Sequence, residues 1–405
     1  MTWTTSSRRA FLTGGIATTA HLAASRPVRS QEFVQRILVP DTPFFSLASS
    51  MADDMREKTG ALLEIDSSPP ESIDFALRED ARTGAHSIQG AIVPMWNIGG
   101  FLVDDIIRPL DQLIAGTSNG LSQVDLSGEL PAVRRLRRFG SEQVALPIDG
   151  DCQLLYFQRD VLESDDFANS FAAETGMALG VPQGWDELLG IAKWWNGRGG
   201  QGVALNLAPA GAGVMPFLGM AASYATGPSQ LSEFWFDRAT FEPQIASTRH
   251  VAALNDFTQL VKTGPADQST WHVPDAWNAF LNGDALFTIA GPDLLTAAID
   301  WQHSRRHLIG VARLPGAPGT SGALPSGIVA GSFAGNALGP CWGGVVRSTA
   351  QRPNETLSVL SIFSETAFQR DRGSSVDDGI DPARLLQLPG SLAEDESGSL
   401  EHYID

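Results

Sequence analysis

The chain has 405 residues, of which 43% are apolar and 18% charged, and its formal net charge is -18. This length suits two domains of ordinary size, and the composition is that of a folded protein. The acidic excess repels phosphate backbones and anionic membrane surfaces, so nucleic acid is not an expected partner.

The first 30 residues have the layout of an export leader. Ser-Arg-Arg-Ala-Phe-Leu at residues 7–12 precedes a mild apolar run that ends at Ala24, and Ser-Arg-Pro follows. This order is typical of a twin-arginine signal, although Thr13 stands where a lysine is usual; the alternative is two chance arginines near a terminus. No later run is apolar for long enough to span a bilayer. We therefore expect a periplasmic or extracellular protein exported by the twin-arginine route.

Export makes the two cysteines, Cys152 and Cys341, candidates for a disulfide. The alternative is that both are small buried apolar side chains. We favour the alternative, because two residues in a chain of this size have no compelling reason to meet.

The first third of the chain alternates strands with helices. Apolar runs predict strands at 37–39, 61–65 and 91–95, and apolar residues at helical spacing predict helices at 43–60 and 71–82. This alternation indicates a largely parallel sheet flanked by helices. Ligands of such sheets meet the loops at the carboxyl ends of strands, where Phe45, Trp96 and Asn97 fall. Aromatic residues are common both in ligand pockets and in cores, so a binding role and a core role for Trp96 are equally compatible with the sequence.

Residues 144–160 predict a crossover between two sheets: an apolar strand, Pro147, the turn Asp149-Gly-Asp151, and a second apolar strand. Burying a carboxylate between strands costs desolvation free energy unless water or a ligand contacts it. We therefore expect Asp149 and Asp151 to face a cleft. A pair of aspartates in one turn does not fix the geometry of glycoside hydrolysis, and binding explains them more simply.

The remainder continues the strand and helix pattern. Trp185 begins a helix and is interpreted as structural, a strand at 308–314 returns to the first lobe, and 371–405 forms an acidic, poorly ordered tail. The other predicted elements are strands at 203–206, 285–290 and 341–346, helices at 210–224, 249–263 and 355–368, a helix ending at 282–283, and a long loop at 315–340.

The sequence gives little support for a catalytic or metal-binding motif. Gly116-Thr-Ser118-Asn-Gly120 matches a hydrolase nucleophile pattern, but a helix or loop precedes it where a strand is required. His303 and His307 are separated by Ser-Arg-Arg, whose charge opposes a metal cation. No dinucleotide or phosphate-loop motif occurs. We expect no cofactor, no metal and no enzymatic activity.

Several segments together resemble the extracellular solute-binding proteins of ABC importers, in the sugar-binding group that includes the maltose-binding proteins. The matching segments are Trp96-Asn-Ile-Gly-Gly, Ile107-Arg-Pro-Leu-Asp-Gln-Leu, Ala145 to Asp160, Trp185-Asp-Glu-Leu and Ala279 to Pro292. They occur in the family's order across most of residues 35–370. The resemblance implies an α/β periplasmic-binding-protein-like fold of two lobes, each a mostly parallel sheet flanked by helices, joined by hinge strands.

The resemblance also implies a division of the chain and a binding site. After the leader at 1–30, residues 31–147 with 312–347 form the first lobe, and 148–311 with 348–370 form the second. The implied ligand contacts are Trp96, Asn97, Asp151, Asp293 and Trp342. The loop after the first strand adds Phe45 to the candidate site, and the crossover turn adds Asp149. Asp293 stands where sugar-binding relatives often have an aromatic residue, which argues against a maltose-like stacked ligand.

The resulting hypothesis is a monomeric receptor that closes on a sugar or oligosaccharide and delivers it to the membrane subunits of an ABC permease. The aspartates leave a polyamine or another cationic solute as an alternative. From another class, an exported carbohydrate hydrolase remains an alternative.

Overall fold

The computed structural model describes residues 33–41, 56–57, 62–116, 126, 129, 131–209, 211–224, 233–300, 303–318 and 341–364. The helices and strands below all belong to the unit Val34–Asp405. The predicted leader, all of the helix predicted at 43–60 except residues 56–57, most of the loop at 315–340 and the acidic tail lie outside the described residues. No described helix is long and apolar enough to cross a membrane.

The first sheet has the strand order β2-β1-β3-β11-β6. Its strands are β1 (Val34–Pro40), β2 (Leu62–Ser68), β3 (Gly90–Pro94), β6 (Leu146–Pro147) and β11 (Trp342–Val346). β1 is parallel to β2 and β3, whereas β11 is antiparallel to β3 and β6. A strand from late in the chain is thus inserted between two early ones.

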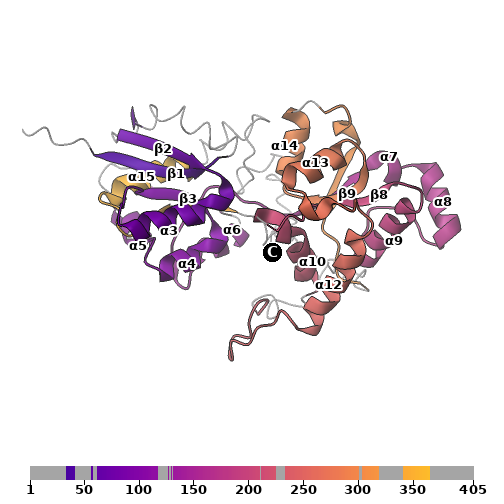
Figure 1. Ribbon diagram of the computed structural model, residues 1–405, viewed down its shortest axis with the longest axis horizontal. Coiled ribbons are helices and arrows are strands. Elements are labelled where there is room, and N and C mark those ends of the chain that lie inside the picture. The colour runs from indigo at the N-terminus through magenta and orange to yellow at the C-terminus, as the bar shows by residue number, and fades with distance from the viewer. Residues whose placement is uncertain are drawn as a thin grey trace, which may run out of the picture. The chain divides into compact units, whose positions relative to one another are not determined.

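Alternation along β1 gives the first sheet two buried faces, because successive side chains point to opposite sides. Ile37 and Val39 pack with α15 (Pro353–Ser364), and Leu38 packs with α3 (Ile73–Thr83). Figure 1 shows α3 and α15 beside β1 to β3. We call this sheet with its helices lobe 1.

The second sheet has the order β10-β7-β9-β8. Its strands are β7 (Leu154–Gln158), β8 (Gln201–Ala204), β9 (Ala285–Ala290) and β10 (Ile309–Arg313). β7 is antiparallel to β9 and β10, and β8 is parallel to β9. Both sheets are therefore mixed, and only the β1–β2–β3 and β8–β9 pairings are parallel.

The second sheet is also buried on both faces. Leu155 and Phe157 pack with apolar side chains of α8 (Asp165–Thr175) and α9 (Trp185–Asn196), whereas Tyr156 packs with those of α13 (Val273–Leu281). We call this sheet with its helices lobe 2. Its further helices are α7 (Arg159–Leu162), α10 (Met215–Ser223), α12 (Thr248–Val261) and α14 (Asp293–Asp300).

The remaining elements are short. They are α4 (Ile98–Val103), α5 (Asp111–Gly116), α6 (Pro131–Leu136), the pair β4 (Arg138–Phe139) and β5 (Glu142–Gln143), and the 3-10 turns η1 (Pro70–Ser72), η2 (Met95–Asn97), η3 (Gly211–Val214), η4 (Gln268–Thr270) and η5 (Arg306–Leu308).

The structure corrects three details of the sequence interpretation. β10 pairs with β7 in lobe 2, although its strand was expected to return to lobe 1. α15 packs on the first sheet, although 348–370 was assigned to the second lobe. Each sheet was expected to be mostly parallel, but two of the four described strand pairings in the first sheet and two of the three in the second are antiparallel. Apolar runs identify strands and helices, but the partner on which each packs is set by tertiary contacts.

Candidate functional site

Strand register brings several loops to one edge of the second sheet. Leu154, at the start of β7, is paired with Ala290 at the end of β9. Because β8 runs parallel to β9, its carboxyl end lies at the same edge. Several loop residues therefore lie together at this edge, in the position that ligand-binding loops occupy in α/β sheets. They are residues 151–153, 206 and 291–293.

A small cavity of about 130 Å³ lies at this edge. α10 contributes Met215 and Pro216, and α13 contributes Val273 and Trp277. The other lining residues are Asp151, Cys152, Gln153, Asn206, Ala212, Ile289, Ala290, Gly291 and Asp293. The lining is supplied by strand ends, by helix starts and by the loops between them.

Two predicted site residues, Asp151 and Asp293, meet at Gly291. A Cβ atom on Gly291 would lie 2.8 Å from Asp293 Oδ1 and 3.7 Å from Asp151 Oδ1, so both carboxylates approach the same side of one backbone position. The hydroxyl of buried Tyr156 donates a 2.8 Å hydrogen bond to the Gly291 carbonyl oxygen and holds this backbone. The absence of a side chain at Gly291 leaves room for the two acids.

Cys152 follows Asp151 in the chain and lines the same cavity. Burial, followed by the charges of Asp151, Asp293 and Asp149, raises the pKa of its thiol to about 12. Burial together with Asp151 and Asp149 also raises the pKa of the Cys341 thiol, which donates a 3.2 Å hydrogen bond to the Asp151 carbonyl oxygen. Both cysteines are free thiols in the structure.

Amide and aromatic groups complete the cavity. The Asn206 side chain is 7% exposed, and its Nδ2 donates a 3.0 Å hydrogen bond to the Ala212 carbonyl oxygen, which fixes the plane of the amide. Gln153 supplies a second buried amide, and Trp277 a partly buried indole. Sequence reasoning did not select these three residues. Asn206 was recognisable, because it stands at the carboxyl end of a predicted strand, and Asn97 lies just after the end of another.

Asp149 and Trp342 lie where the chain passes from one sheet to the other. The Trp342 N–H donates to the Asp149 carbonyl oxygen at 3.1 Å, and the Ile148 N–H donates to the Trp342 carbonyl oxygen at 3.0 Å. The Trp342 side chain is 7% exposed and packs in the apolar layer under α15. Neither residue is among the described residues that line the cavity.

Trp96 and Asn97 lie in η2, immediately after β3 in lobe 1. Trp96 is 52% exposed and Asn97 is partly buried. The Met95 N–H donates to the Cys341 carbonyl oxygen at 2.9 Å, which places η2 beside the segment that reaches Asp151. They too are outside the described lining of the cavity, and Phe45 lies outside the described residues.

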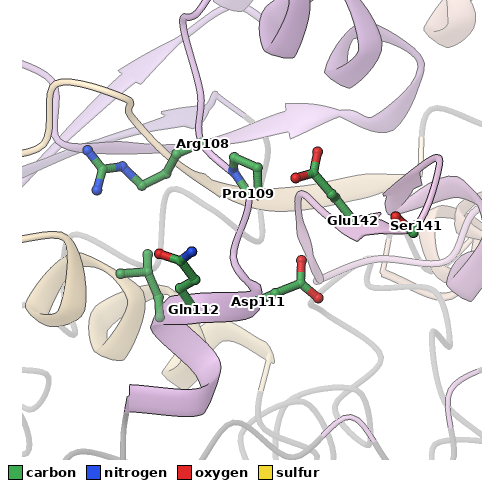
Figure 2. Close-up of a pocket in the computed structure, with 7 residues that line it drawn as sticks. Arg108, Pro109, Asp111, Gln112, Ser141 and Glu142 are labelled. Carbon is green, nitrogen blue, oxygen red and sulfur yellow. The ribbon is translucent and has the colours of Figure 1, made fainter.

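A second hollow, about 430 Å³, lies in lobe 1 (Figure 2). Arg108, Asp111 and Glu142 supply its charges. Arg108 Nε donates to the Arg347 carbonyl oxygen at 3.2 Å, and Asp111 Oδ2 accepts from the Gln143 N–H at 2.9 Å. Since these two side chains hold neighbouring backbone, we interpret the hollow as structural.

Within the described residues, no three histidine, cysteine, aspartate or glutamate side chains are arranged to hold a metal ion. Trp185, interpreted as structural, is 2% exposed and donates from Nε1 to Ser223 Oγ at 2.7 Å.

Comparison with known proteins identifies the fold. No family model and no curated protein sequence matches the chain. Among solved structures, the maltose-bound MalE3 of Thermotoga maritima is 19% identical, with a TM-score of 0.65 over 91% of this chain and 86% of that one. A ribitol-bound ABC transporter solute-binding protein from Agrobacterium radiobacter is 15% identical, with a TM-score of 0.66 over 92% of this chain and 84% of that one.

A third structure is the tagatose-bound ABC transporter solute-binding protein of Thermotoga lettingae, which is 14% identical, with a TM-score of 0.66 over 92% of this chain and 86% of that one. These similarities span both sheets and confirm the predicted class. The chain has the two-lobed fold of the solute-binding proteins of ABC transporters.

Proposed function

We propose that the protein is the exported solute-binding component of an ABC importer and that it binds a sugar or polyol at the lobe 2 cavity. The observation that carries the proposal is the meeting of Asp151, Asp293, Asn206 and Trp277 at one edge of the second sheet. Structures of the same fold contain maltose, ribitol and tagatose.

The chemistry of the lining suits a polyhydroxylated molecule. Carboxylate and amide oxygens accept hydrogen bonds from hydroxyl groups, and the face of an indole packs against the C–H groups of a sugar or alditol. The cavity is small beside the range of about 300 to 1,000 Å³ of complete small-molecule sites. It therefore holds one part of the ligand, and groups from lobe 1 cover the rest on closure.

Closure would bend the chain at the crossover that carries it from Pro147 to Leu154, with the second sheet moving as a unit. Trp96 and Asn97 are the lobe 1 groups we assign to the closed site, and Trp96 is exposed enough to reach a ligand. Phe45, Asp149 and Trp342 belong to the same proposal, with Asp149 and Trp342 acting at the hinge.

The partners of this function are the membrane subunits of an ABC permease, and the place of action is the periplasm or the cell exterior, reached by the twin-arginine route. We propose a monomer. A binding role is favoured over hydrolysis because the similar solved structures are those of binding proteins.

A calorimetric titration with maltose, ribitol, mannitol and tagatose tests the proposal. At least one compound should bind and raise the unfolding midpoint, since a ligand at about 100 times its Kd stabilises the native state by about 2.7 kcal/mol. Trp277→Ala should weaken binding at least about tenfold through loss of the packed indole face.

The matched control is Trp235→Ala, which removes an indole that is 45% exposed and outside the cavity lining. It should leave affinity unchanged. Absence of binding across a broad set of sugars and alditols, or release of product from a chromogenic glycoside, would contradict the proposal.

A further inference from the structure

Lobe 1 contains a buried ion pair that the proposed function does not use. Arg137 and Glu129 are 3% and 2% exposed, and Arg137 donates to the two carboxylate oxygens of Glu129 from Nε and Nη2. Its Nη1 donates to Gln143 Oε1. Taking two charges out of water costs free energy that their attraction often fails to offset, and apolar residues of similar volume are frequently as stabilising. Stability alone is therefore a weak explanation for this pair.

The pair fixes the chain between α6 and β4. Arg137 joins these two elements, and its carbonyl oxygen accepts a 3.0 Å hydrogen bond from the Val144 N–H. A guanidinium that donates two parallel hydrogen bonds to one carboxylate has a narrow range of orientations. Residues 133–139 are thus fixed at Arg137 by both its side chain and its backbone.

Residues 133–139 contact the turn that carries Trp96 on its N-terminal side. Met95 precedes Trp96 in η2, is 2% exposed, and packs with Val133 and Leu136 of α6. Figure 1 shows α6 close to β3 and α4. The Trp96 side chain itself is 52% exposed. The direction of an indole exposed to this extent is set mainly by the backbone that carries it.

A second contact lies on the C-terminal side of the same turn. Gly99 and Gly100 belong to the first turn of α4, and glycine gives a helix more conformational freedom than other residues. The ring of Phe139 lies over Gly99, where a Cβ atom would be 3.0 Å from Phe139 Cε2. The ring restricts this backbone, because the glycine cannot move toward it. The turn with Trp96 is therefore held by α6 before it and by β4 after it.

We propose that Arg137 is a positioning residue for ligand binding: through its ion pair with Glu129 it fixes residues 133–139, which set the direction of the Trp96 indole. Phe139 acts on the same turn from β4. The inference rests on the proposed function, in which Trp96 covers the ligand, and it names the residues that orient this side chain. The ion pair is then explained by the geometry that it enforces, which two apolar side chains would not reproduce.

The first test replaces the ion pair by apolar side chains. The double variant Glu129→Leu, Arg137→Met leaves no unpaired buried charge, so the unfolding midpoint should be retained. The affinity for the tightest binder among maltose, ribitol, mannitol and tagatose should nevertheless fall by about threefold or more. If the pair served stability alone, affinity would be retained together with the midpoint.

The orientation of Trp96 needs a measurement that is independent of any ligand. In protein labelled with fluorotryptophan, the fluorine NMR signal of Trp96 is assigned by its loss in Trp96→Phe. This signal should shift in the double variant, while most of the other tryptophan signals should keep their positions. Calorimetry and the fluorine spectrum thus report binding and side-chain position separately.

A second variant leaves the ion pair intact. Phe139→Ala removes a ring that is 45% exposed, so the fold should be retained. It should shift the Trp96 signal and lower affinity as the double variant does. Phe75→Ala is the matched control, because Phe75 is 69% exposed on α3 of the same lobe and is not among the atoms nearest to Gly99. It should change neither quantity. If the double variant does not fold, Phe139→Ala decides the inference.

The outcomes separate this inference from the proposed function. An unchanged Trp96 signal and unchanged affinity in both variants would overturn the inference and leave the proposed function standing. A shifted signal with unchanged affinity would overturn the role of residues 133–139 in binding. An effect of Phe139→Ala alone would overturn the assignment to Arg137. Absence of binding by the wild type counts against the proposed function and against the binding part of this inference, and the fluorine signal then decides the positioning of the turn.

Discussion

Gly291 makes room for two acids at one backbone position, and a single methyl group there tests the arrangement. In Gly291→Ala the new Cβ would lie 2.8 Å from Asp293 Oδ1, closer than real Cβ contacts allow, so the carboxylate must rotate away. We expect ligand affinity to fall at least about tenfold while the unfolding midpoint changes little, because the moved group is a side chain beside a cavity.

The control for this substitution is Gly190→Ala in α9, where a Cβ meets nothing within 4 Å. Replacing a helical glycine should stabilise the protein by up to about 1 kcal/mol and leave affinity unchanged. Full affinity in Gly291→Ala would show that the ligand does not use the carboxylates beside this glycine.

His250 makes stability depend on pH. Its side chain is 2% exposed, its Nδ1 lies 3.0 Å from Ser247 Oγ, and its ring lies 4.6 Å from that of Phe234. Burial and then the charge of Arg249 lower its pKa below the ordinary value of 6.5. The unfolded chain therefore binds a proton more readily than the folded one, and the stability that the neutral ring contributes is present above about pH 6.5 and lost below it.

Urea unfolding on either side of that pH measures the effect. His250→Gln should be less stable than the wild type at neutral pH and should lose less stability on acidification. His307→Gln, at an exposed site in η5, should retain the wild-type pH dependence. Identical pH profiles for the wild type and His250→Gln would show that the ring does not titrate with folding.

Among the elements, the β7–β10 pair depends on a glycine covered by an aromatic ring. Gly310 is paired with Phe157, and a Cβ on Gly310 would lie 2.2 Å from two atoms of that ring. Gly310→Ala should destabilise the protein by about 1 to 3 kcal/mol, the usual cost of overpacking a buried contact.

Adding Phe157→Leu should recover part of that loss, because the shorter side chain vacates the space that the methyl group needs. The free energy of unfolding of the two single variants and the double variant, from urea titration, gives the coupling. Strict additivity would show that the ring does not cover Gly310 in the folded protein.

The positions of most described strands follow from the sequence, since buried apolar runs such as 285–290 end at turn residues. The partner of a strand does not follow in this way. The apolar run at 308–314 has the same local pattern whether its strand pairs with β7 or with β1. Only packing in the assembled sheet selects between these two partners. The packing of α15 on lobe 1 is unpredictable from local pattern for the same reason.

The candidate site divides in a similar way. Asp151 was selected from its turn between two strands and Asp293 from the resemblance, and both line one cavity. Trp277 was missed because it belongs to a helix whose spacing indicates only an apolar face, and which end of that face borders a cavity depends on the neighbouring strands. The burial of Trp342 follows from the position of β11 within its sheet, which local sequence does not encode.

For the whole molecule, the two thiols provide a test of the crossover between the sheets. Cys152 and Cys341 lie in segments joined by the hydrogen bond from Cys341 Sγ to the Asp151 carbonyl oxygen. With the pKa of Cys152 at about 12 and that of Cys341 also raised, almost no thiolate is present at neutral pH.

A thiol-reactive dye should therefore label neither cysteine in the native protein over minutes and both after unfolding in guanidinium chloride. Cys152→Ser should reduce the unfolded count to one. Rapid labelling of the native protein would contradict the buried crossover, and absence of labelling after unfolding without a reductant would indicate that the two sulfurs are bonded.

The insertion of β11 between β3 and β6 has a consequence for biosynthesis. Every described strand of lobe 2 lies within residues 154–313, so its sheet can assemble while the end of the chain is still on the ribosome. The first sheet has to wait for residue 346, and the layer that covers it waits for α15. A nascent chain that stalls before β11 would carry the complete sheet of lobe 2 and an incomplete sheet of lobe 1, in which β3 has an unpaired edge. We expect chaperones to bind at that edge.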